Sequence, residues 1–217
     1  MTSVGVVELR QYVLHPGARE TLVELFDREF VESQEAVGAR ILGQFRDLDD
    51  PDRFVWLRGF TDMAARHAAL AAFYGGPVWA AHRDAANATM VAFDDVLLLR
   101  PVGAPPPVAA RSAEPPPSVL TATVLPLAGP ATSDLVDRVD ALLAGAGTHV
   151  ATLETEPSAN TFPALPVREG EHVLVRLARP DGADDERWRA VERELAGQLA
   201  GPPQHRRLHP TPRSALR

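Results

Sequence analysis

A proline-rich segment at residues 101–117 divides this chain into two stretches of similar length that carry the same order of predicted elements. The segment reads PVGAPPPVAARSAEPPP, contains seven prolines and lacks the regular spacing of aliphatic residues found in helices and strands. Proline favours the extended polyproline conformation. We therefore expect a semi-rigid linker at 101–117 between a first domain at 1–100 and a second domain at 118–217.

The first stretch has the predicted order strand, helix, strand, strand, helix, strand. The strands are predicted at residues 4–14, 40–46, 54–60 and 91–100, and the helices at 18–37, 62–73 and 77–87. Asp62 has the residue type of a helix N-cap, and Pro77 suits the first position of a helix. Gly75 and Gly76 end the helix at 62–73, and a separate helix begins at Pro77.

The second stretch repeats this order with different residues. Its strands are predicted at 119–127, 148–154, 172–178 and within 205–210, and its helices at 133–144 and 184–199. The order βαββαβ is that of a ferredoxin-like unit, in which both helices cover one face of a four-stranded antiparallel sheet.

A ferredoxin-like sheet leaves its second face and its edges uncovered, and two units can solve both problems by joining. The predicted fold class is therefore α+β, with two tandem ferredoxin-like units forming a pseudo-dimeric α/β barrel whose helices lie outside. A barrel closed within one chain predicts a monomeric pseudo-dimer, whereas strand edges left free predict a homodimer.

Composition excludes several classes of function. The net charge of −7 argues against a nucleic-acid surface. The absence of cysteine excludes disulfides and thiolate catalysis, and because all 22 basic residues are arginine, lysine Schiff-base chemistry is also excluded. No signal leader and no apolar run long enough to span a membrane are found, so we expect a cytoplasmic protein.

Motifs for cofactors and metals are also missing from the sequence. The histidines show none of the spacings typical of metal sites, and there is no phosphate-binding loop or nucleophile elbow. We therefore expect no metal and no cofactor, although ligation of a haem by a single histidine stays open.

Several motifs in the first stretch resemble those of the NIPSNAP family. They are ELRQY at 8–12, HPG at 15–17, GQFRDLDDPDRFVWLRGF at 43–60, FYGGPVW at 73–79 and AHRDAANATM at 81–90. The resemblance covers about residues 5–100, and the second stretch matches in topology alone. It implies the fold of the dimeric α/β-barrel superfamily. That superfamily includes cofactor-free monooxygenases, haem-dependent enzymes, lyases and isomerases, so the resemblance implies no particular reaction.

Alternation along the strands separates an apolar face from a polar one. We assign the apolar rows, such as Val7 with Leu9 and Val55 with Leu57, to the helix side. The side chains then predicted to point into the barrel are Glu8, Arg10, Tyr12, Gln44, Arg46, Phe54, Trp56 and Arg58. Such a mixture of arginines and aromatic groups is typical of a cavity for an anionic or aromatic, oxygenated small molecule.

These residues suggest the following roles in a site. Catalytic roles are assigned to His82, Tyr12 and Arg58, and substrate-binding roles to Glu8, Arg10, Gln44, Arg46, Trp56 and Trp79. Tyr12 or His82 would move a proton, the arginines would hold and polarise the substrate, and the tryptophans would form walls. A packing role for His82 is the alternative.

Two classes of function remain open from the sequence. One is a cofactor-free enzyme of oxygenase, isomerase or cyclase type in bacterial specialised metabolism. The other is a non-catalytic binding or scaffold protein, in which Glu8 and the arginines form a buried salt-bridged core. An open cavity that reaches Tyr12 and Trp56 favours the enzyme, and a dry interior with Glu8 paired to arginine favours the scaffold.

Overall fold

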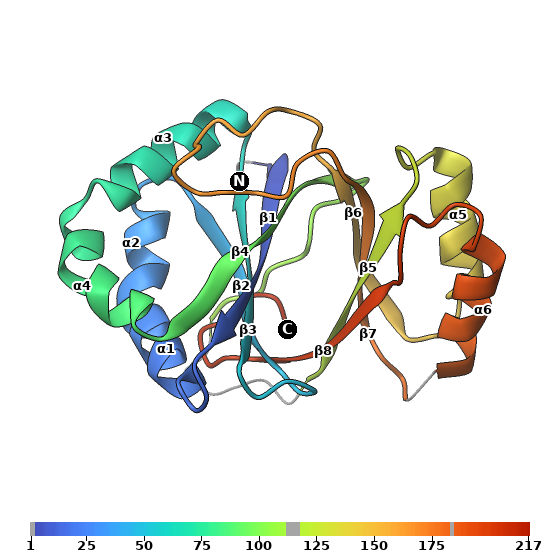
Figure 1. Ribbon diagram of the computed structural model, residues 1–217, viewed down its shortest axis with the longest axis horizontal. Coiled ribbons are helices and arrows are strands. Elements are labelled where there is room, and N and C mark those ends of the chain that lie inside the picture. Colours follow the sequence, from blue (N-terminus) through green and yellow to red (C-terminus); the bar gives the residue numbers. More distant parts are fainter. Residues whose placement is uncertain (1–2, 112–117, 183–184) are drawn as a thin grey trace.

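The computed structural model describes residues 3–111, 118–182 and 185–217 (Figure 1). The elements of the first half are β1 (Val6–Leu14), α1 (Arg19–Leu25), the π-helical turn η1 (Phe26–Phe30), α2 (Val31–Glu35), β2 (Arg40–Asp47), β3 (Arg53–Phe60), α3 (Met63–Tyr74), α4 (Pro77–Asn87) and β4 (Met90–Val102). Those of the second half are β5 (Leu120–Leu127), α5 (Ser133–Leu142), β6 (Thr148–Thr155), β7 (His172–Arg179), α6 (Asp185–Leu195) and β8 (Gln204–Pro210).

The eight strands form one closed barrel in the order β1-β3-β2-β8-β5-β7-β6-β4, which confirms the predicted barrel of mixed α/β type. Each half contributes four neighbouring strands, in the order β4-β1-β3-β2 from the first half and β8-β5-β7-β6 from the second. Figure 1 shows the helices of the two halves on opposite sides of the barrel, outside the strands.

The two halves meet along two short seams. Between β2 and β8 the pairing runs only from Phe45↔Pro210 to Asp47↔Leu208, and between β4 and β6 from Leu99↔Thr155 to Val102↔Thr152. The pairing of β1 with β3 is longer and extends from Val6↔Phe60 to Val13↔Arg53. Because the seams contain few backbone hydrogen bonds, packing inside the barrel must contribute much of the cohesion between the halves.

The barrel interior is filled by apolar side chains from all eight strands. They include Val7, Leu9, Phe45, Val55, Leu57, Leu97, Leu99, Leu120, Ala122, Val124, Ala151, Leu153, Val173, Val175, Leu177 and Leu208. Leu216, near the end of the chain, is fully buried in the same cluster. The interior is therefore a hydrophobic core.

The predicted direction of the polar strand face is consequently wrong. Tyr12 and Trp56 belong to a second core cluster with Leu22, Phe26 and Phe30 of the helical segment, so the row that was expected inside the barrel faces the helices. Both faces of β1 and β3 are buried, one by the barrel and one by helices. Alternation separates the two faces of such a strand but does not identify the inner one.

The predicted linker is only partly described. Pro101 and Val102 belong to β4, and residues 112–117 lie outside the described residues. Before that gap, the backbone N–H of Ala109 donates to Ala215 at 2.8 Å, and the Arg111 guanidinium pairs with Glu35 at 2.6 Å. This part of the segment therefore lies against the first half and the C-terminal residues. Within the described residues, no helix is long and apolar enough to cross a membrane.

Candidate functional site

A buried ionic cluster lies between the first sheet and its helices, with Glu8 of β1 at its centre. Arg10 Nη1 and Arg58 Nε donate to Glu8 Oε2 at 2.7 and 2.8 Å, and Arg66 Nε of α3 donates to Glu8 Oε1 at 2.6 Å. All four side chains are at most 1% exposed. Since three guanidiniums share one carboxylate, the four side chains have a net charge of 3 − 1 = +2.

The electrostatics of this cluster keep Glu8 ionised. Burial alone would raise the pKa of the Glu8 carboxyl, but the charges of Arg58, Arg10 and Arg66 hold that pKa far below its usual range. Burial also lowers the pKa of the Arg66 guanidinium, against the opposing effect of Glu8. Buried charge of one sign is costly unless it is matched, so the excess positive charge favours an additional anion.

Aromatic side chains adjoin the ionic cluster. Arg10 Nε donates to the Tyr12 hydroxyl at 2.9 Å, and the Arg10 guanidinium carbon lies 5.5 Å from the ring centroids of both Tyr12 and Trp56. Burial raises the pKa of Tyr12, so the phenol is protonated at neutral pH. Its oxygen already accepts from Arg10, and its proton has no acceptor among the described residues. Tyr12 is therefore placed to act as a hydrogen-bond donor rather than as a base.

Seven buried side-chain atoms have no hydrogen-bond partner within the described ranges, and two of them form a neighbouring donor and acceptor on β3 and β2. These two are the indole Nε1 of Trp56, a donor, and the side-chain Oε1 of Gln44, an acceptor. The two residues are directly opposed across β2 and β3, and Gln44 Nε2 donates to Asp27 Oδ1 of η1 at 3.2 Å. Because unpaired buried polar groups are uncommon and unfavourable, a donor and an acceptor left free side by side indicate a place for a polar ligand or water.

The π-helical turn η1 covers this pair. The Phe26 ring centroid lies 4.8 Å from that of Trp56, and the Phe30 centroid lies 5.7 Å from that of Trp79 on α4. In the following helix α2, the Gln34 side chain accepts a hydrogen bond from Arg58 Nη1 at 2.9 Å. Single π-helical turns within α-helices frequently occur at functional sites, which agrees with the unpaired atoms beneath this one.

Helix α4 forms the outer cover of the cluster. Ala86 is its only fully buried residue, and Gly75 and Gly76 connect it to α3. On this helix His82 Nε2 lies 3.5 Å from Glu29 Oε2 of η1, and the His82 ring lies 6.3 Å from Phe30. His82 and Trp79 are thus at the rim of the cluster, over η1.

The second half of the chain also contributes to this region. The segment between β6 and β7 crosses α3, as Figure 1 shows in orange. Asn160 Oδ1 accepts from Arg66 Nη1 at 3.0 Å, and the Phe162 ring stacks on Tyr74 at a centroid distance of 6.1 Å. No sequence motif predicts this contact, because it joins residues far apart in the chain.

The structure brings together five of the predicted site residues: Glu8, Arg10, Tyr12, Trp56 and Arg58. Gln44 is adjacent to them, although all of these side chains lie on the helix side of the sheet and not inside the barrel. Arg46 is separate, since its Nε donates to Glu20 of α1 at 2.9 Å, near the end of β2.

Sequence reasoning missed Arg66, Gln34 and Asn160. A signal for Arg66 exists, because it shares the buried face of α3 with Leu70 and Phe73 at helical spacing. A charged residue on an otherwise apolar helix face predicts a buried partner.

The equivalent row in the second half has different chemistry. The register matches the pair of Glu8 and Arg58 with Thr121 of β5 and Ala178 of β7, whereas Thr123 opposed to Arg176 matches Arg10 opposed to Trp56. The Arg176 guanidinium pairs with Asp140 of α5, so it also faces helices rather than the interior. No group of histidine and acidic side chains suited to a metal ion occurs in the described parts of either half.

Comparisons with known proteins support the family resemblance and the fold. Residues 7–105 match the NIPSNAP family, which confirms the resemblance of the first half. No curated protein matches the chain.

Solved structures match over both halves. An anthrone oxidase-like protein has a TM-score of 0.58 at 14% identity, over 96% of this chain and 92% of its own. A "Putative monooxygenase" from Fusobacterium nucleatum has a TM-score of 0.57 at 9% identity, over 97% and 94%. Another structure so described, from Lactobacillus acidophilus, has a TM-score of 0.51 at 12% identity, over 96% and 94%. At these identities the likeness establishes the shared barrel fold alone.

Proposed function

We propose that this chain, whose residues 7–105 match the NIPSNAP family, is a small-molecule-binding α/β-barrel protein that acts without a cofactor on an oxygenated aromatic metabolite. The observation that carries the proposal is the buried excess of positive charge around Glu8, beside the unpaired Nε1 of Trp56 and Oε1 of Gln44. The proposed site is the layer between the first sheet and its helices.

The chemistry of the cluster favours a ligand that carries an anionic oxygen on an aromatic body. Arg10 and Arg58 offer planar donor groups that fit a carboxylate or an enolate. The hydroxyl of Tyr12 and the indole N–H of Trp56 are two neutral donors next to these cations. The rings of Phe26 and Trp56, with Tyr12, offer edges and faces for an aromatic body.

This arrangement would stabilise the anion of a phenolic or enolic ligand. Nearby guanidiniums lower the pKa of such a ligand, and its anion is the electron-rich form that isomerisation, cyclisation or oxygenation requires. Tyr12, being protonated, would donate a hydrogen bond to the developing oxyanion. His82, at the rim beside Glu29, would accept the released proton if the ligand extends beneath α4. The monooxygenase and anthrone oxidase-like structures that share this fold are consistent with the oxygenase class.

The same proposal includes the organisation of the chain. We interpret the two sets of four strands as ferredoxin-like units within domains at 1–100 and 118–217, joined by the segment 101–117. Both seams of the barrel are formed within one chain, which supports a monomeric pseudo-dimer over a homodimer. A cytoplasmic location and a role in specialised metabolism belong to this proposal as well.

A non-catalytic binding or scaffold protein is the second candidate. It is favoured by the complete burial of Glu8 and by its pairing with Arg10, Arg58 and Arg66, which is the arrangement that the sequence predicts for a scaffold and which ties α3 to the sheet. The apolar filling of the barrel interior also agrees with this candidate. The two candidates differ in one measurable respect, because only the enzyme converts the ligand that it binds.

Titration with 1-hydroxy-2-naphthoate tests the proposed site. We expect this aromatic hydroxy acid to bind, and Trp56→Phe to weaken its binding roughly 10- to 100-fold, the usual effect of losing a hydrogen bond to a charged group. Isothermal titration calorimetry measures the affinity, and Trp188→Phe, in the second half, is the matched control. Equal affinities of wild type and Trp56→Phe would place the ligand elsewhere. Oxygen uptake and product analysis on the same samples separate the candidates, since binding without turnover supports the scaffold.

A further inference from the structure

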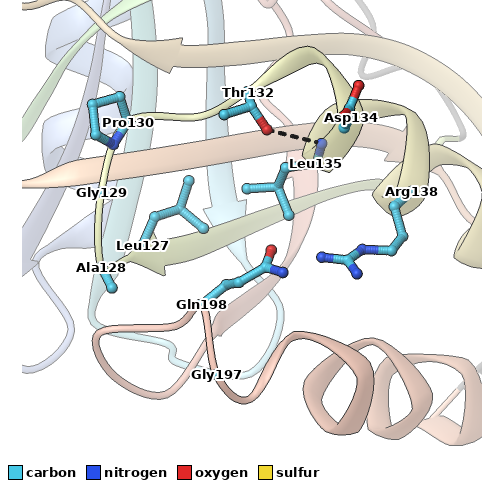
Figure 2. Close-up of a pocket in the computed structure, with 10 residues that line it drawn as sticks. All are labelled: Leu127, Ala128, Gly129, Pro130, Thr132, Asp134, Leu135, Arg138, Gly197 and Gln198. Atoms are coloured by element: carbon cyan, nitrogen blue, oxygen red, sulfur yellow. Dashed lines mark hydrogen bonds between the residues drawn. The ribbon is translucent and has the colours of Figure 1, made fainter.

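A separate cavity opens in the second half of the chain, on the opposite side of the barrel from Glu8. It has a volume of about 710 Å³ and lies between the end of β5, the start of α5 and the segment that follows α6 (Figure 2). This volume falls within the range of cavities that hold small-molecule ligands.

The walls of this cavity are fixed by hydrogen bonds. The backbone N–H of Ala128 donates to the carbonyl of Gln198 at 2.8 Å, which joins the two wall segments. Thr132 caps α5 by accepting from the backbone N–H of Leu135 at 3.2 Å, a bond drawn in Figure 2. Because these segments are held in place in the free protein, a ligand need not order them on binding.

Two polar side chains converge in the cavity. Figure 2 shows the guanidinium of Arg138 extending from α5 toward the side-chain amide of Gln198, with Leu127 and Leu135 beside them. Neither polar group has a hydrogen-bond or ion-pair partner in the part of the chain that the structure describes. Leu127 and Leu135 are both buried, at 4% and 7% exposure, and they form an apolar floor.

We propose that this cavity binds a monocarboxylate with an apolar body. The planar guanidinium of Arg138 fits a carboxylate through two parallel hydrogen bonds, and the Gln198 amide can donate a third. The apolar body would cover Leu127 and Leu135. Asp134 also lines the cavity, so the two charged side chains of the lining sum to zero and a dianion such as a phosphate monoester is disfavoured. The Asp134 carboxylate is directed away from Arg138, which leaves the guanidinium available to a ligand.

The site is independent of the one proposed around Glu8. Its residues come from β5, α5 and the segment after α6, and none of them belongs to the ionic cluster. Failure of ligand binding at one of the two sites therefore does not contradict binding at the other.

Titration of the full chain with octanoate, followed by ¹H–¹⁵N NMR, tests this inference. We expect octanoate to shift the backbone amides of Gly129, Arg138 and Gln198, and the uncharged octanamide to bind at least about 10-fold more weakly. Arg138→Gln should weaken octanoate binding roughly 10- to 100-fold. Arg193→Gln, a change of the same type at an exposed position of α6, is the matched control and should leave binding unchanged.

A second variant tests the cavity without removing the charge. A Cβ atom at Gly129 would meet no heavy atom within 4 Å, so Gly129→Phe should fold normally while it fills the cavity and abolishes the octanoate shifts. Equal binding of octanoate and octanamide would overturn carboxylate recognition. No shifts at millimolar octanoate, or unchanged binding in both Arg138→Gln and Gly129→Phe, would overturn the site itself.

Discussion

Replacement of Glu8 by glutamine should lower the free energy of unfolding by roughly 3–5 kcal/mol at neutral pH, the usual effect of breaking a buried ion pair from one side. The variant leaves the guanidiniums of Arg10, Arg58 and Arg66 buried without a carboxylate. Urea denaturation followed by circular dichroism measures the difference. Glu20→Gln is the matched control, because this half-exposed glutamate pairs with Arg46 near the surface and its loss should change stability by less than about 1 kcal/mol.

The effect of Glu8→Gln should also depend on pH. The pKa of Glu8 in the folded chain lies below its ordinary value of 4.5, so its contribution is fully present above pH 4.5 and is lost as the pH falls toward the folded pKa. The difference between wild type and variant should therefore narrow by roughly 1.4 kcal/mol per pH unit below about pH 4.5. A difference that stays constant from pH 7 to about 3 would show that the charge of Glu8 contributes nothing.

Replacement of Phe45 by alanine should destabilise the chain by roughly 3–5 kcal/mol, as expected for an emptied aromatic core position. Phe45 is fully buried in the barrel interior and lies on β2 at the seam with β8. Its loss should therefore weaken a junction that has few backbone hydrogen bonds. Phe93→Ala is the matched control, since Phe93 is 43% exposed and its removal should cost less than about 1 kcal/mol.

The environment of Phe45 provides a sharper form of this test. A Cβ atom at Gly43 would lie 2.5 Å from the Cζ atom of the Phe45 ring, so Gly43→Ala alone should overpack the interior. In the Phe45→Ala background the same methyl group enters a cavity. We expect Gly43→Ala to destabilise the wild type and to be neutral or stabilising in that background. Strictly additive effects in thermal unfolding would contradict this account of the interior.

The order of elements could be predicted from the sequence because it depends on local periodicity and turn residues. The predicted strands at 40–46 and 54–60 correspond to β2 (Arg40–Asp47) and β3 (Arg53–Phe60). The predicted N-cap is also confirmed, since the Asp62 side chain accepts from the backbone N–H of Ala65 at 2.7 Å. In each case the residues that predict the element lie within that element or a few residues from it.

The direction of the strand faces could not be predicted in the same way. Val7 and Glu8 are both fully buried, one inside the barrel and the other beneath α3. The interior of this barrel is apolar because side chains that converge from all its strands fill it. The layer between sheet and helices can hold charge, because helices supply partners such as Arg66. Which face of a strand points into the barrel is therefore decided by the closed fold and not by the residues of that strand.

The candidate site was predictable in its residue types but not in its full membership. Glu8, Arg10 and Arg58 are predicted as site residues because strand alternation places each of them on the polar face of its strand. Asn160 reaches Arg66 across a sequence separation of 94 residues, and only the closure of the barrel brings the two together. Local patterns contain no information on such contacts.

Closure of the barrel within a single polypeptide has a consequence for how its two sides can differ. In a barrel built from two identical chains, every substitution appears twice, once on each side of the symmetry axis. In this chain the two sides of the barrel are formed by different residues, so a substitution changes one side alone. Glu8 faces Arg58 on one side, whereas Thr121 faces Ala178 at the matching position of the other. One scaffold can therefore hold a positively charged, arginine-rich layer on one side and a hydroxyl-bearing layer on the other, each free to change without altering its counterpart.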